Sequence, residues 1–469
     1  MSEQFDLVVI GAGPAGEKAA AQAAYFGRRV AIVEREPTPG GAAVRNAGVP
    51  TKTLRETALY VTGFQQRDVY GVGLQLDPGA AIAHLRSRAA HVVETMTTAA
   101  ADNIARHGIE LICGSGRLGS GRSVLVDSSD GRTRALDAGV ILIATGSRPF
   151  HPPGIPFDDP DVLDSETIIG VDRPLRSLVV VGGGPVGCEY ASIYAAVGTE
   201  VTLVDNAPRL IPFMDGEISD LVAANFRKMG LSVLLGAGKA TVERDADGLK
   251  LTLANGEVIR PEKILFAAGR SGNTEALGLA EAGVETDERG RVLVDECFRT
   301  TAAGIYAAGD VIGPPALASV SMEQGRVAAC HAFGIPFKQS VDQLAPFGVY
   351  SIPEVAMVGL TEEAASARGI DYEVGRAWFA RNTRGIISGA TDGMIKLVFR
   401  RENRELLGVH IFGASAAEMI HLGQAVLHFG GTIDYFIDTT FNVPTESEAF
   451  KYAAYDGLQR LAGAANGNR

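Results

Sequence analysis

Residues 5–34 read FDLVVIGAGPAGEKAAAQAAYFGRRVAIVE, and this stretch decides the fold. An apolar run leads into a GxGxxG turn made by Gly11, Gly13 and Gly16, and an alanine-rich helical segment leads into a second apolar run that ends at Glu34. The first glycine permits a tight turn, the second lets a pyrophosphate approach the backbone, and the third lets the helix pack on the strand. The stretch therefore predicts a strand–helix–strand unit that holds a dinucleotide at the helix N-terminus.

The same unit occurs a second time along the chain. Residues 176–205 read RSLVVVGGGPVGCEYASIYAAVGTEVTLVD, and an offset of 171 positions maps the first copy onto it. A single GxGxxG pattern is weak evidence, but two copies that share strand, helix and terminal acid argue strongly for binding. The acid at each end, Glu34 or Asp205, is placed to accept hydrogen bonds from a ribose. The chain is therefore predicted to bind two dinucleotides, the second through Gly182, Gly184, Gly187 and Asp205.

The length and composition of the whole chain indicate a soluble protein of several domains. Its 469 residues exceed one hydrophobic core, and its 57 glycines fit many tight strand-to-helix turns. A formal net charge of −12 argues against nucleic acid or an anionic membrane as the main partner. With no leader-like segment and no apolar run near about 18 residues, a soluble cytoplasmic protein is expected. The four cysteines form no CxxC or CxxxxC pair and the eight histidines show no metal-binding spacing, so no metal site is expected.

Three further motifs each adjoin a predicted strand or helix. Gly40-Gly41 precedes an apolar helix, Ala144-Thr145-Gly146 ends the strand at 140–143, and Gly309-Asp310 ends a strand that begins near Gly304. Together with both glycine turns, these motifs make the chain resemble the pyridine nucleotide-disulfide oxidoreductases, the flavoproteins that include glutathione reductase and dihydrolipoamide dehydrogenase. The resemblance covers essentially the whole chain.

The resemblance implies a cofactor for each copy. The first glycine turn, with Glu34, would bind the ADP half of FAD, and Asp310 would bind the ribityl chain. The second turn, with Asp205, would bind NAD(P)H. Further cofactor-binding positions implied by the family pattern are Gly41, Thr145, Gly146, Gly269 and Ala318.

The resemblance also implies an α/β architecture of two Rossmann-like domains followed by an α+β dimerisation domain. The FAD domain would comprise residues 1–151 and 279–340, the NAD(P) domain residues 152–278, and the dimerisation domain residues 341–469. This last segment is expected to mix strands, such as residues 394–400, with helices, such as residues 417–428. Its short, evenly spaced apolar runs also suit an α+β interface domain. A homodimer is therefore expected.

The disulfide-reducing residues of the family are missing. Matching residues 40–52 to the family pattern places Ala43 and Gly48 at the two cysteine positions, and neither side chain can form a disulfide or a thiolate. Val443 replaces the family histidine, and an isopropyl group does no acid–base chemistry. Glu448 keeps the carboxylate that would orient that base. Disulfide reduction through this loop is therefore not expected.

The hydride-transfer residues of the family are present. Lys52 matches the family lysine near the flavin, and Glu189 matches the glutamate that pairs with it. A cation beside the flavin stabilises its reduced, anionic form, and a carboxylate keeps that lysine charged in a poorly hydrated site. Lys52 and Glu189 are the predicted catalytic residues.

Residues 53–60, 187–192, 311–318, 350–355 and 407–413 most resemble soluble pyridine nucleotide transhydrogenases, which pass hydride from NADPH through FAD to NAD⁺. These usually keep one cysteine of the pair, whereas this chain has neither, and that departure resembles NAD(P)H:quinone reductases. The predicted activity is transhydrogenation; the alternatives are a quinone reductase or other diaphorase with a small-molecule acceptor, and a catalytically retired flavoprotein sensor. Asp205 favours NAD(H) by repelling a 2′-phosphate, and only Arg209 lies close enough in sequence to offset it.

Overall fold

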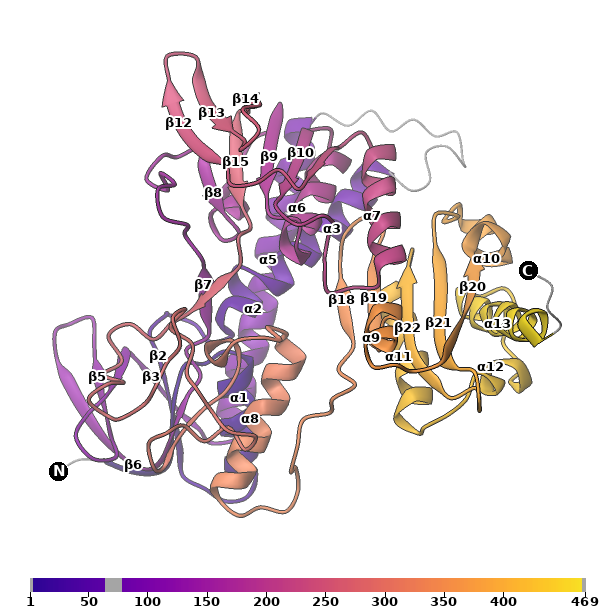
Figure 1. Cartoon of the computed structure of the whole chain (residues 1–469). Coiled ribbons are helices and arrows are strands. Elements are labelled where there is room, and N and C mark those ends of the chain that lie inside the picture. Colours follow the sequence, from indigo (N-terminus) through magenta and orange to yellow (C-terminus); the bar gives the residue numbers. More distant parts are fainter. Residues whose placement is uncertain (1–2, 64–77, 466–469) are drawn as a thin grey trace. The chain divides into compact units, whose positions relative to one another are not determined.

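The computed structural model describes residues 3–63 and 78–465. The chain divides into two compact units, drawn in Figure 1. The first comprises residues 1–53, 87–150 and 269–343, and the second comprises residues 54–86, 151–268 and 344–469. Within the described ranges, no helix is both long enough and apolar enough to cross a membrane.

The first unit is built on a seven-stranded sheet of order β3-β2-β1-β6-β5-β4, with β17 paired to β6. The strands β3, β2, β1, β6 and β17 run parallel, whereas β5 and β4 form an antiparallel extension. The strand bounds are β1 (Glu3–Ile10), β2 (Val30–Glu34), β3 (Glu110–Cys113), β4 (Ser115–Leu118), β5 (Ser123–Asp127), β6 (Thr133–Ile143) and β17 (Ile305–Ala307).

The side chains of β1 point alternately to the two faces of this sheet, and both faces are buried. Val8 and Ile10 pack into the cluster on one face, while Leu7 and Val9 pack into the cluster on the other, as side chains of period two must. The second cluster contains the alanines of α1 (Pro14–Tyr25) and of α8 (Ala318–Ala332), which lie side by side. A Cβ on Gly325 of α8 would overlap the Ala15 carbonyl of α1, so this glycine permits the close approach.

The second unit is built on two five-stranded sheets, besides a small ribbon of three strands. A parallel sheet has the order β11-β10-β9-β15-β8, and an antiparallel sheet has the order β18-β19-β22-β21-β20. The strands of the parallel sheet are β8 (Val162–Asp164), β9 (Ser177–Val181), β10 (Glu200–Asp205), β11 (Ser232–Leu235) and β15 (Lys263–Phe266). Those of the antiparallel sheet are β18 (Phe347–Val349), β19 (Val355–Gly359), β20 (Tyr372–Trp378), β21 (Met394–Arg400) and β22 (Leu406–Phe412).

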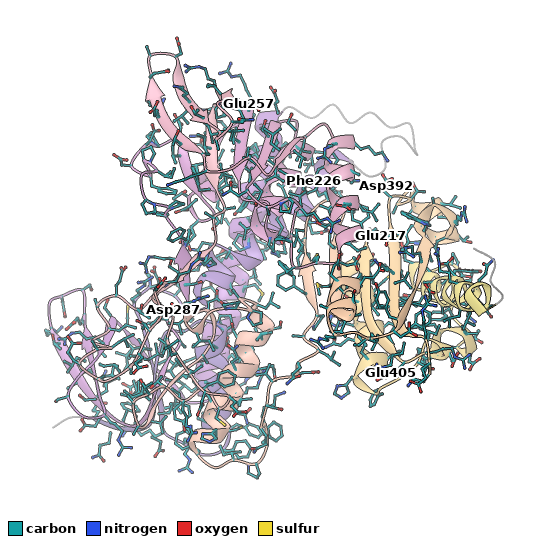
Figure 2. The ribbon with its side chains drawn as sticks, viewed as in Figure 1. Glu217, Phe226, Glu257, Asp287, Asp392 and Glu405 are labelled. Carbon is teal, nitrogen blue, oxygen red and sulfur yellow. The ribbon has the colours of Figure 1, made fainter. Side chains whose placement is uncertain are left out.

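Helices flank both sheets of the second unit. α6 (Pro185–Ala196) contacts β9 and β10, and α7 (Gly216–Lys228), which carries the buried Phe226, contacts both β11 and β22 (Figures 1 and 2). α11 (Ala416–His428) packs on β19 and β22, and α13 (Ala449–Ala465) packs on β20 and β21.

The other helices are α2 (Gly41–Arg45), α3 (Gly48–Thr62), α5 (Pro78–Arg106), α9 (Glu362–Ala367), α10 (Thr383–Ser388) and α12 (Asp434–Asp438), and the 3₁₀ turns are 167–170, 310–312, 379–381 and 446–448. The small strands are β7 (Ser147–Pro149), paired with β16 (Arg270–Gly272), and the ribbon of β12 (Thr241–Asp245), β13 (Gly248–Thr252) and β14 (Val258–Ile259).

The predicted fold class is confirmed: both strand–helix–strand copies form parallel sheets, and an α+β segment follows them. The predicted residues 394–400 form β21, and the predicted helix at 417–428 is α11. The predicted boundaries of three domains stay a prediction. The second compact unit contains both the expected NAD(P) segment and the expected dimerisation segment.

Candidate functional site

The two glycine turns are structurally equivalent. Gly11 has a φ of 108° and Gly182 a φ of 118°, in the left-handed region that favours glycine. A Cβ on Gly11 would overlap the Ala144 carbonyl, and a Cβ on Gly182 would overlap the carbonyl of Ala267. The third glycines, Gly16 and Gly187, are blocked in the same way by the carbonyl of the first glycine in their own turn. These positions therefore require glycine for the turn to close.

The middle glycines differ from the others because the space around them is open. Gly13 and Gly184 are the N-caps of α1 and α6, and neither helix has a side chain that caps its first N–H groups. A Cβ on Gly184 would meet no heavy atom within 4 Å, and one on Gly13 would meet only the Gly41 Cα, at 3.8 Å. The free N–H groups and the positive end of each helix dipole thus face space that a pyrophosphate can fill.

The acidic residues that end the two copies, Glu34 and Asp205, make equivalent hydrogen bonds. Glu34 accepts from the N–H of Ala12 at 2.7 Å and from that of Glu36 at 3.0 Å. Asp205 accepts from the N–H of Gly183 and, at 2.6 Å, from that of Ala207. These two donors lie 171 positions after the two donors to Glu34, the same offset that relates the two copies. Each carboxylate is therefore held at the end of its second strand, beside its glycine turn, where a ribose hydroxyl of a dinucleotide would lie.

Further predicted FAD-binding residues gather around the first turn. The Gly40 N–H donates to the Ala12 carbonyl at 2.9 Å, and a Cβ on Gly41 would lie 2.7 Å from the Gly13 Cα, so this loop rests on the glycine turn. On the other side, the Thr145 hydroxyl donates to the Asn273 carbonyl at 2.7 Å, and the Gly146 carbonyl accepts from the N–H of Asn273 at 3.0 Å. The residues present fit the ADP half of a flavin dinucleotide.

Asp310 lies within the same unit, at the end of the strand β17. Its carboxylate accepts from the Ser147 hydroxyl at 2.9 Å and lies 4.0 Å from the guanidinium of Arg270, which also donates to Ser147. The side chain is about a quarter exposed, so one of its oxygens can still accept from a cofactor hydroxyl. Ala318 is the first residue of α8, close in sequence to this acid.

A cavity of about 480 Å³ opens at the second glycine turn. Its wall includes Gly182 and Gly184 of the turn, Asp205 and Asn206, and residues 238–241. Pro152–Ile155 and Phe266–Ala268 complete its wall, and Gly269 follows directly with a φ of 102°. A volume of this size, lined by a pyrophosphate turn and a ribose acid, fits the adenosine end of a pyridine nucleotide.

The two predicted catalytic residues lie in different units, Lys52 on α3 and Glu189 on α6. Glu189 is only 4% exposed and accepts a hydrogen bond from the Tyr350 N–H at 3.0 Å. The neighbouring Ser192 accepts from the Ile352 N–H at 3.1 Å, so α6 is fixed to the segment that precedes β19. This backbone contact sets the position of the Glu189 carboxylate.

Arg55 anchors the helix of Lys52 and was not predicted as a site residue. It lies three positions after Lys52 on α3 and is 3% exposed. Its guanidinium donates to the Ser351 carbonyl at 2.9 Å and lies 3.1 Å from the Glu354 carboxylate, which in turn accepts from the Ala417 N–H at the start of α11. In the sequence, Arg55 is one of several polar residues of this segment, together with Lys52 and Glu56, and nothing marks it as a site residue.

The two positions matched to the family cysteines are adjacent. Ala43 lies in α2 and Gly48 begins α3, and a Cβ on Gly48 would lie 3.0 Å from the Ala43 carbonyl. In the other unit, the Val443 side chain is more than half exposed. Glu446 lies 3.8 Å from Arg384, and Glu448 accepts from the Tyr452 hydroxyl at 3.2 Å.

All four cysteines are free thiols. Cys188 and Cys330 are buried, as structural cysteines usually are, and burial raises the pKa of both. Cys297 is half-buried, and Cys113 is exposed at the end of β3.

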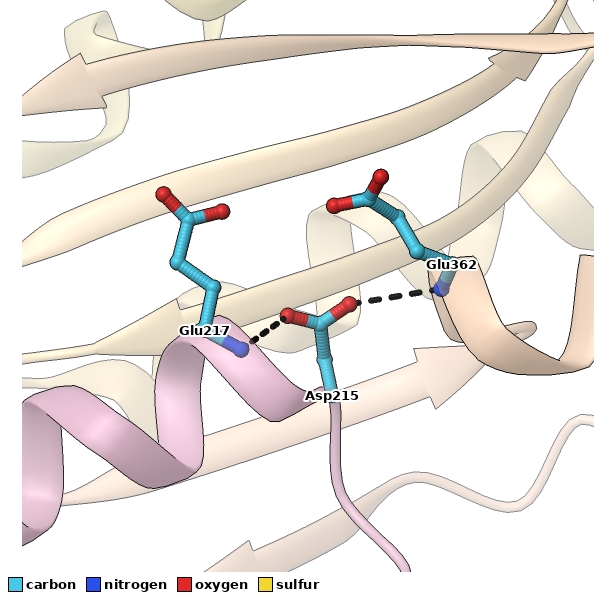
Figure 3. A group of neighbouring side chains, drawn as sticks. All are labelled: Asp215, Glu217 and Glu362. Carbon is cyan, nitrogen blue, oxygen red and sulfur yellow. Dashed lines mark hydrogen bonds between the residues drawn. The ribbon is translucent and has the colours of Figure 1, made fainter.

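A group of three carboxylates lies outside both cofactor sites (Figure 3). Asp215 caps α7 by accepting from the Glu217 N–H at 3.2 Å, and it also accepts from the Glu362 N–H at 3.3 Å. Carboxylate oxygens of the three residues lie within 4.8 Å of one another. The ammonium of Lys396 lies among them, 2.7 Å from Asp215 and 2.9 Å from Glu217, and also pairs with Glu362. The lysine occupies the place a cation would take, so the group is an ion cluster of the protein itself.

Comparison with known proteins identifies the family. Residues 5–325 match the model described as pyridine nucleotide-disulphide oxidoreductase, and residues 345–454 match the dimerisation domain of the same family. A soluble pyridine nucleotide transhydrogenase of Mycobacterium tuberculosis is 44% identical over 98% of both chains, and one of Pseudomonas putida is 39% identical over 97% of this chain and 99% of its own.

Two solved structures share the fold over nearly the whole chain. LpdA of Mycobacterium tuberculosis is 26% identical with a TM-score of 0.87, and it covers 97% of this chain and 99% of its own. The copper(II) complex of RclA, an HOCl-induced flavoprotein disulfide reductase of Escherichia coli, is 27% identical with the same TM-score and coverage. The two glycine turns fit the two cofactors of such oxidoreductases, FAD and NAD(P)H. The chain belongs to the pyridine nucleotide-disulphide oxidoreductase family.

Proposed function

We propose that this oxidoreductase is a transhydrogenase that transfers hydride from NADPH to NAD⁺, giving NADP⁺ and NADH. The observation that carries the proposal is the match, at 37–44% identity over nearly the full chain, to relatives named soluble pyridine nucleotide transhydrogenase. A bound flavin would supply a two-electron carrier that can take hydride from one nicotinamide and return it to another. No disulfide is needed for that exchange.

The residues of the chain would bind and orient the two dinucleotides. The N-termini of α1 and α6 would donate backbone N–H groups to the pyrophosphates, and Glu34 and Asp205 would accept from the adenosine riboses. Asp310, held by Ser147, would accept from the ribityl chain of the flavin. Lys52 would stabilise negative charge on the reduced ring, and Glu189 is proposed as the second catalytic residue.

We also propose that the protein does not reduce disulfides. Ala43 and Gly48 offer no sulfur in the loop beside the first glycine turn, and Val443 offers no proton. Two of the four cysteines are buried thiols with raised pKa values, which makes them poor nucleophiles. The match of residues 345–454 to the dimerisation domain supports a homodimer. The cytoplasmic location is proposed with the activity, because free pyridine nucleotides are its substrates.

An anaerobic assay with NADPH as donor and thio-NAD⁺ as acceptor tests the activity. We expect turnover with thio-NAD⁺ that keeps pace with flavin reduction by NADPH, and negligible turnover with oxidised glutathione or lipoamide. A parallel assay with menadione separates the alternatives: fast menadione reduction without thio-NAD⁺ reduction would identify a quinone reductase. Flavin that neither NADH nor NADPH bleaches would identify a retired sensor.

The coenzyme preference should depend on Asp205. The Asp205→Ser variant keeps an oxygen acceptor for the N–H groups of Gly183 and Ala207 but removes the charge that repels a 2′-phosphate. We expect the ratio of NADPH affinity to NADH affinity to rise about tenfold, the effect of removing one nearby like charge from a partly solvated site. Dissociation constants for both coenzymes measure the ratio. An unchanged ratio would contradict a role for Asp205 in coenzyme choice.

A further inference from the structure

The cation nearest to Asp205 in sequence does not face the second cofactor cavity. Arg209 lies 3.3 Å from Asp220 and 3.7 Å from Glu363, and its guanidinium approaches Gly216 at the start of α7. It is not among the residues that line the cavity. Its charge is therefore shared between a carboxylate of α7, Asp220, and one of α9, Glu363.

A different basic residue lines the cavity. Lys239 is the single basic side chain among the described residues that form its wall. It is exposed, and it forms no ion pair with any residue in the described ranges 3–63 and 78–465. Such a lysine carries a positive charge without an ion-pair partner, on a flexible stem in the wall of the site.

The backbone holds Lys239 beside the ribose end of the cavity. The N–H of Gly236 donates to the Ala207 carbonyl at 3.0 Å, and the N–H of Ala237 donates to the Asp205 carbonyl at 3.1 Å. Gly238 then turns the chain with a φ of 70°, and a Cβ there would overlap Ala254. Lys239 follows directly, so its position is fixed within two residues of the segment bonded to Asp205.

We propose that Lys239 binds the 2′-phosphate of NADPH and thereby lets one site accept both coenzymes. Asp205 favours the free 2′-hydroxyl of NADH, and Lys239 supplies the opposite charge when a 2′-phosphate is present. The proposal rests on the proposed function, because a transhydrogenase must bind NADP(H) and NAD(H) in turn. Lysine suits this task since it binds a phosphate as a point charge and turns into water when the phosphate is absent.

The test is the binding of adenosine 2′,5′-bisphosphate and of 5′-AMP to the oxidised holoenzyme, measured by calorimetry. We expect Lys239→Gln to weaken the bisphosphate about tenfold or more, the loss typical of a hydrogen bond to a charged group, and to change 5′-AMP by less than about twofold. The salt dependence of bisphosphate binding should also decrease in the variant.

Two further variants make the assignment specific. Lys250→Gln removes a lysine of β13 that pairs with Glu243 at 3.6 Å, and it should leave both affinities unchanged. Arg209→Gln tests the rival cation, and a larger loss of bisphosphate affinity in this variant would overturn the proposal. So would an equal loss of both nucleotides in Lys239→Gln, or a wild-type enzyme that binds the bisphosphate no better than 5′-AMP.

The outcome is distinguishable from a failure of the proposed function because binding is measured without turnover. If the protein binds the bisphosphate through Lys239 but does not reduce thio-NAD⁺, the phosphate site is supported and the transhydrogenase assignment is wrong. A protein that reduces thio-NAD⁺ while Lys239→Gln binds both nucleotides like the wild type would keep the activity and lose the site.

Discussion

The Lys52→Met variant is expected to slow the reduction of bound flavin by NADPH by about tenfold or more, which corresponds to about 1.4 kcal/mol in the activation barrier. Methionine keeps the length and the apolar stem of the lysine, so α3 should form as before. It removes the positive charge that would stabilise the anionic reduced flavin in a poorly hydrated site. Anaerobic stopped-flow measurement of flavin absorbance gives the rate directly.

Two matched variants show whether the charge is the cause. Glu189→Gln keeps an oxygen that can accept from the Tyr350 N–H but removes the negative charge, and it should slow flavin reduction in the same direction. Lys338→Met removes a lysine of the first unit that pairs with Glu323 at 2.7 Å, and the rate should stay within about twofold of the wild type. Wild-type rates in Lys52→Met, with a full complement of flavin, would contradict the proposed role.

Both cofactor turns could be predicted from sequence because their chemistry is local. Each turn needs its glycines within six positions and its acid about 20 residues further on. The structure shows why the residue types are required: carbonyl groups block a Cβ at Gly11 and Gly182, and Glu34 and Asp205 make equivalent backbone hydrogen bonds. The two copies therefore share their hydrogen bonds as well as their sequence pattern.

Coenzyme selection was harder to predict because it depends on neighbours in space. Arg209 stands four positions after Asp205 in the chain, yet it turns toward Asp220 and Glu363. Lys239 stands 34 positions after Asp205, and the pairing of β10 with β11 returns the chain to the same cavity. Distance along the chain was a poor guide here because a parallel sheet brings the ends of successive strands together.

The ion cluster around Lys396 had no sequence signal at all. Asp215 and Glu362 are 147 positions apart, and Lys396 follows 34 positions after Glu362. None of the three belongs to a motif, and a lysine within a strand is ordinarily read as solvent-facing. Here the lysine is 1% exposed, because its strand β21 is covered by other elements of the unit.

The Lys396→Met variant is expected to lose about 3–5 kcal/mol of folding stability, the cost of leaving buried carboxylates without their counter-charge. Lys396 is 1% exposed and Asp215 is fully buried. Arg376, a basic residue that remains in the variant, pairs with Glu217 at 2.8 Å and with Glu362 at 3.5 Å. It makes no ion pair with Asp215 among the described residues, so it does not replace Lys396 there. Urea unfolding of the holoenzyme measures the loss. A matched control is Lys228→Met. It removes an exposed lysine of α7 that pairs with Asp392, which is labelled in Figure 2, and it should cost less than about 1 kcal/mol.

The pH dependence of this loss identifies its cause. Burial alone would raise the pKa of Asp215, but a protonated His410 and the hydrogen bond from Lys396 outweigh it, and the pKa lies below the ordinary 3.8. Burial likewise opposes the shift at Glu217, where hydrogen bonds from Arg376 and Lys396 hold the pKa below 4.5. Burial lowers the pKa of His410, so at neutral pH this ring is uncharged and the lysine carries the effect.

The sign of the dependence follows from these directions. A carboxyl group whose pKa is lowered in the folded protein stabilises the fold. This stabilisation is complete when the pH lies above the pKa of the unfolded chain, and it is lost as the pH falls through the lower pKa of the folded protein. Lys396 has a pKa above 10.5 despite its burial, because Asp215 and Glu362 bond to it, so its contribution is complete below 10.5 and is lost as the pH rises through the folded value. The difference in stability between wild type and Lys396→Met should therefore be full near neutral pH, and it should shrink as the pH falls and the carboxyl groups left without a counter-charge in the variant take up protons. A difference that persists unchanged at low pH would instead point to lost packing of the lysine stem.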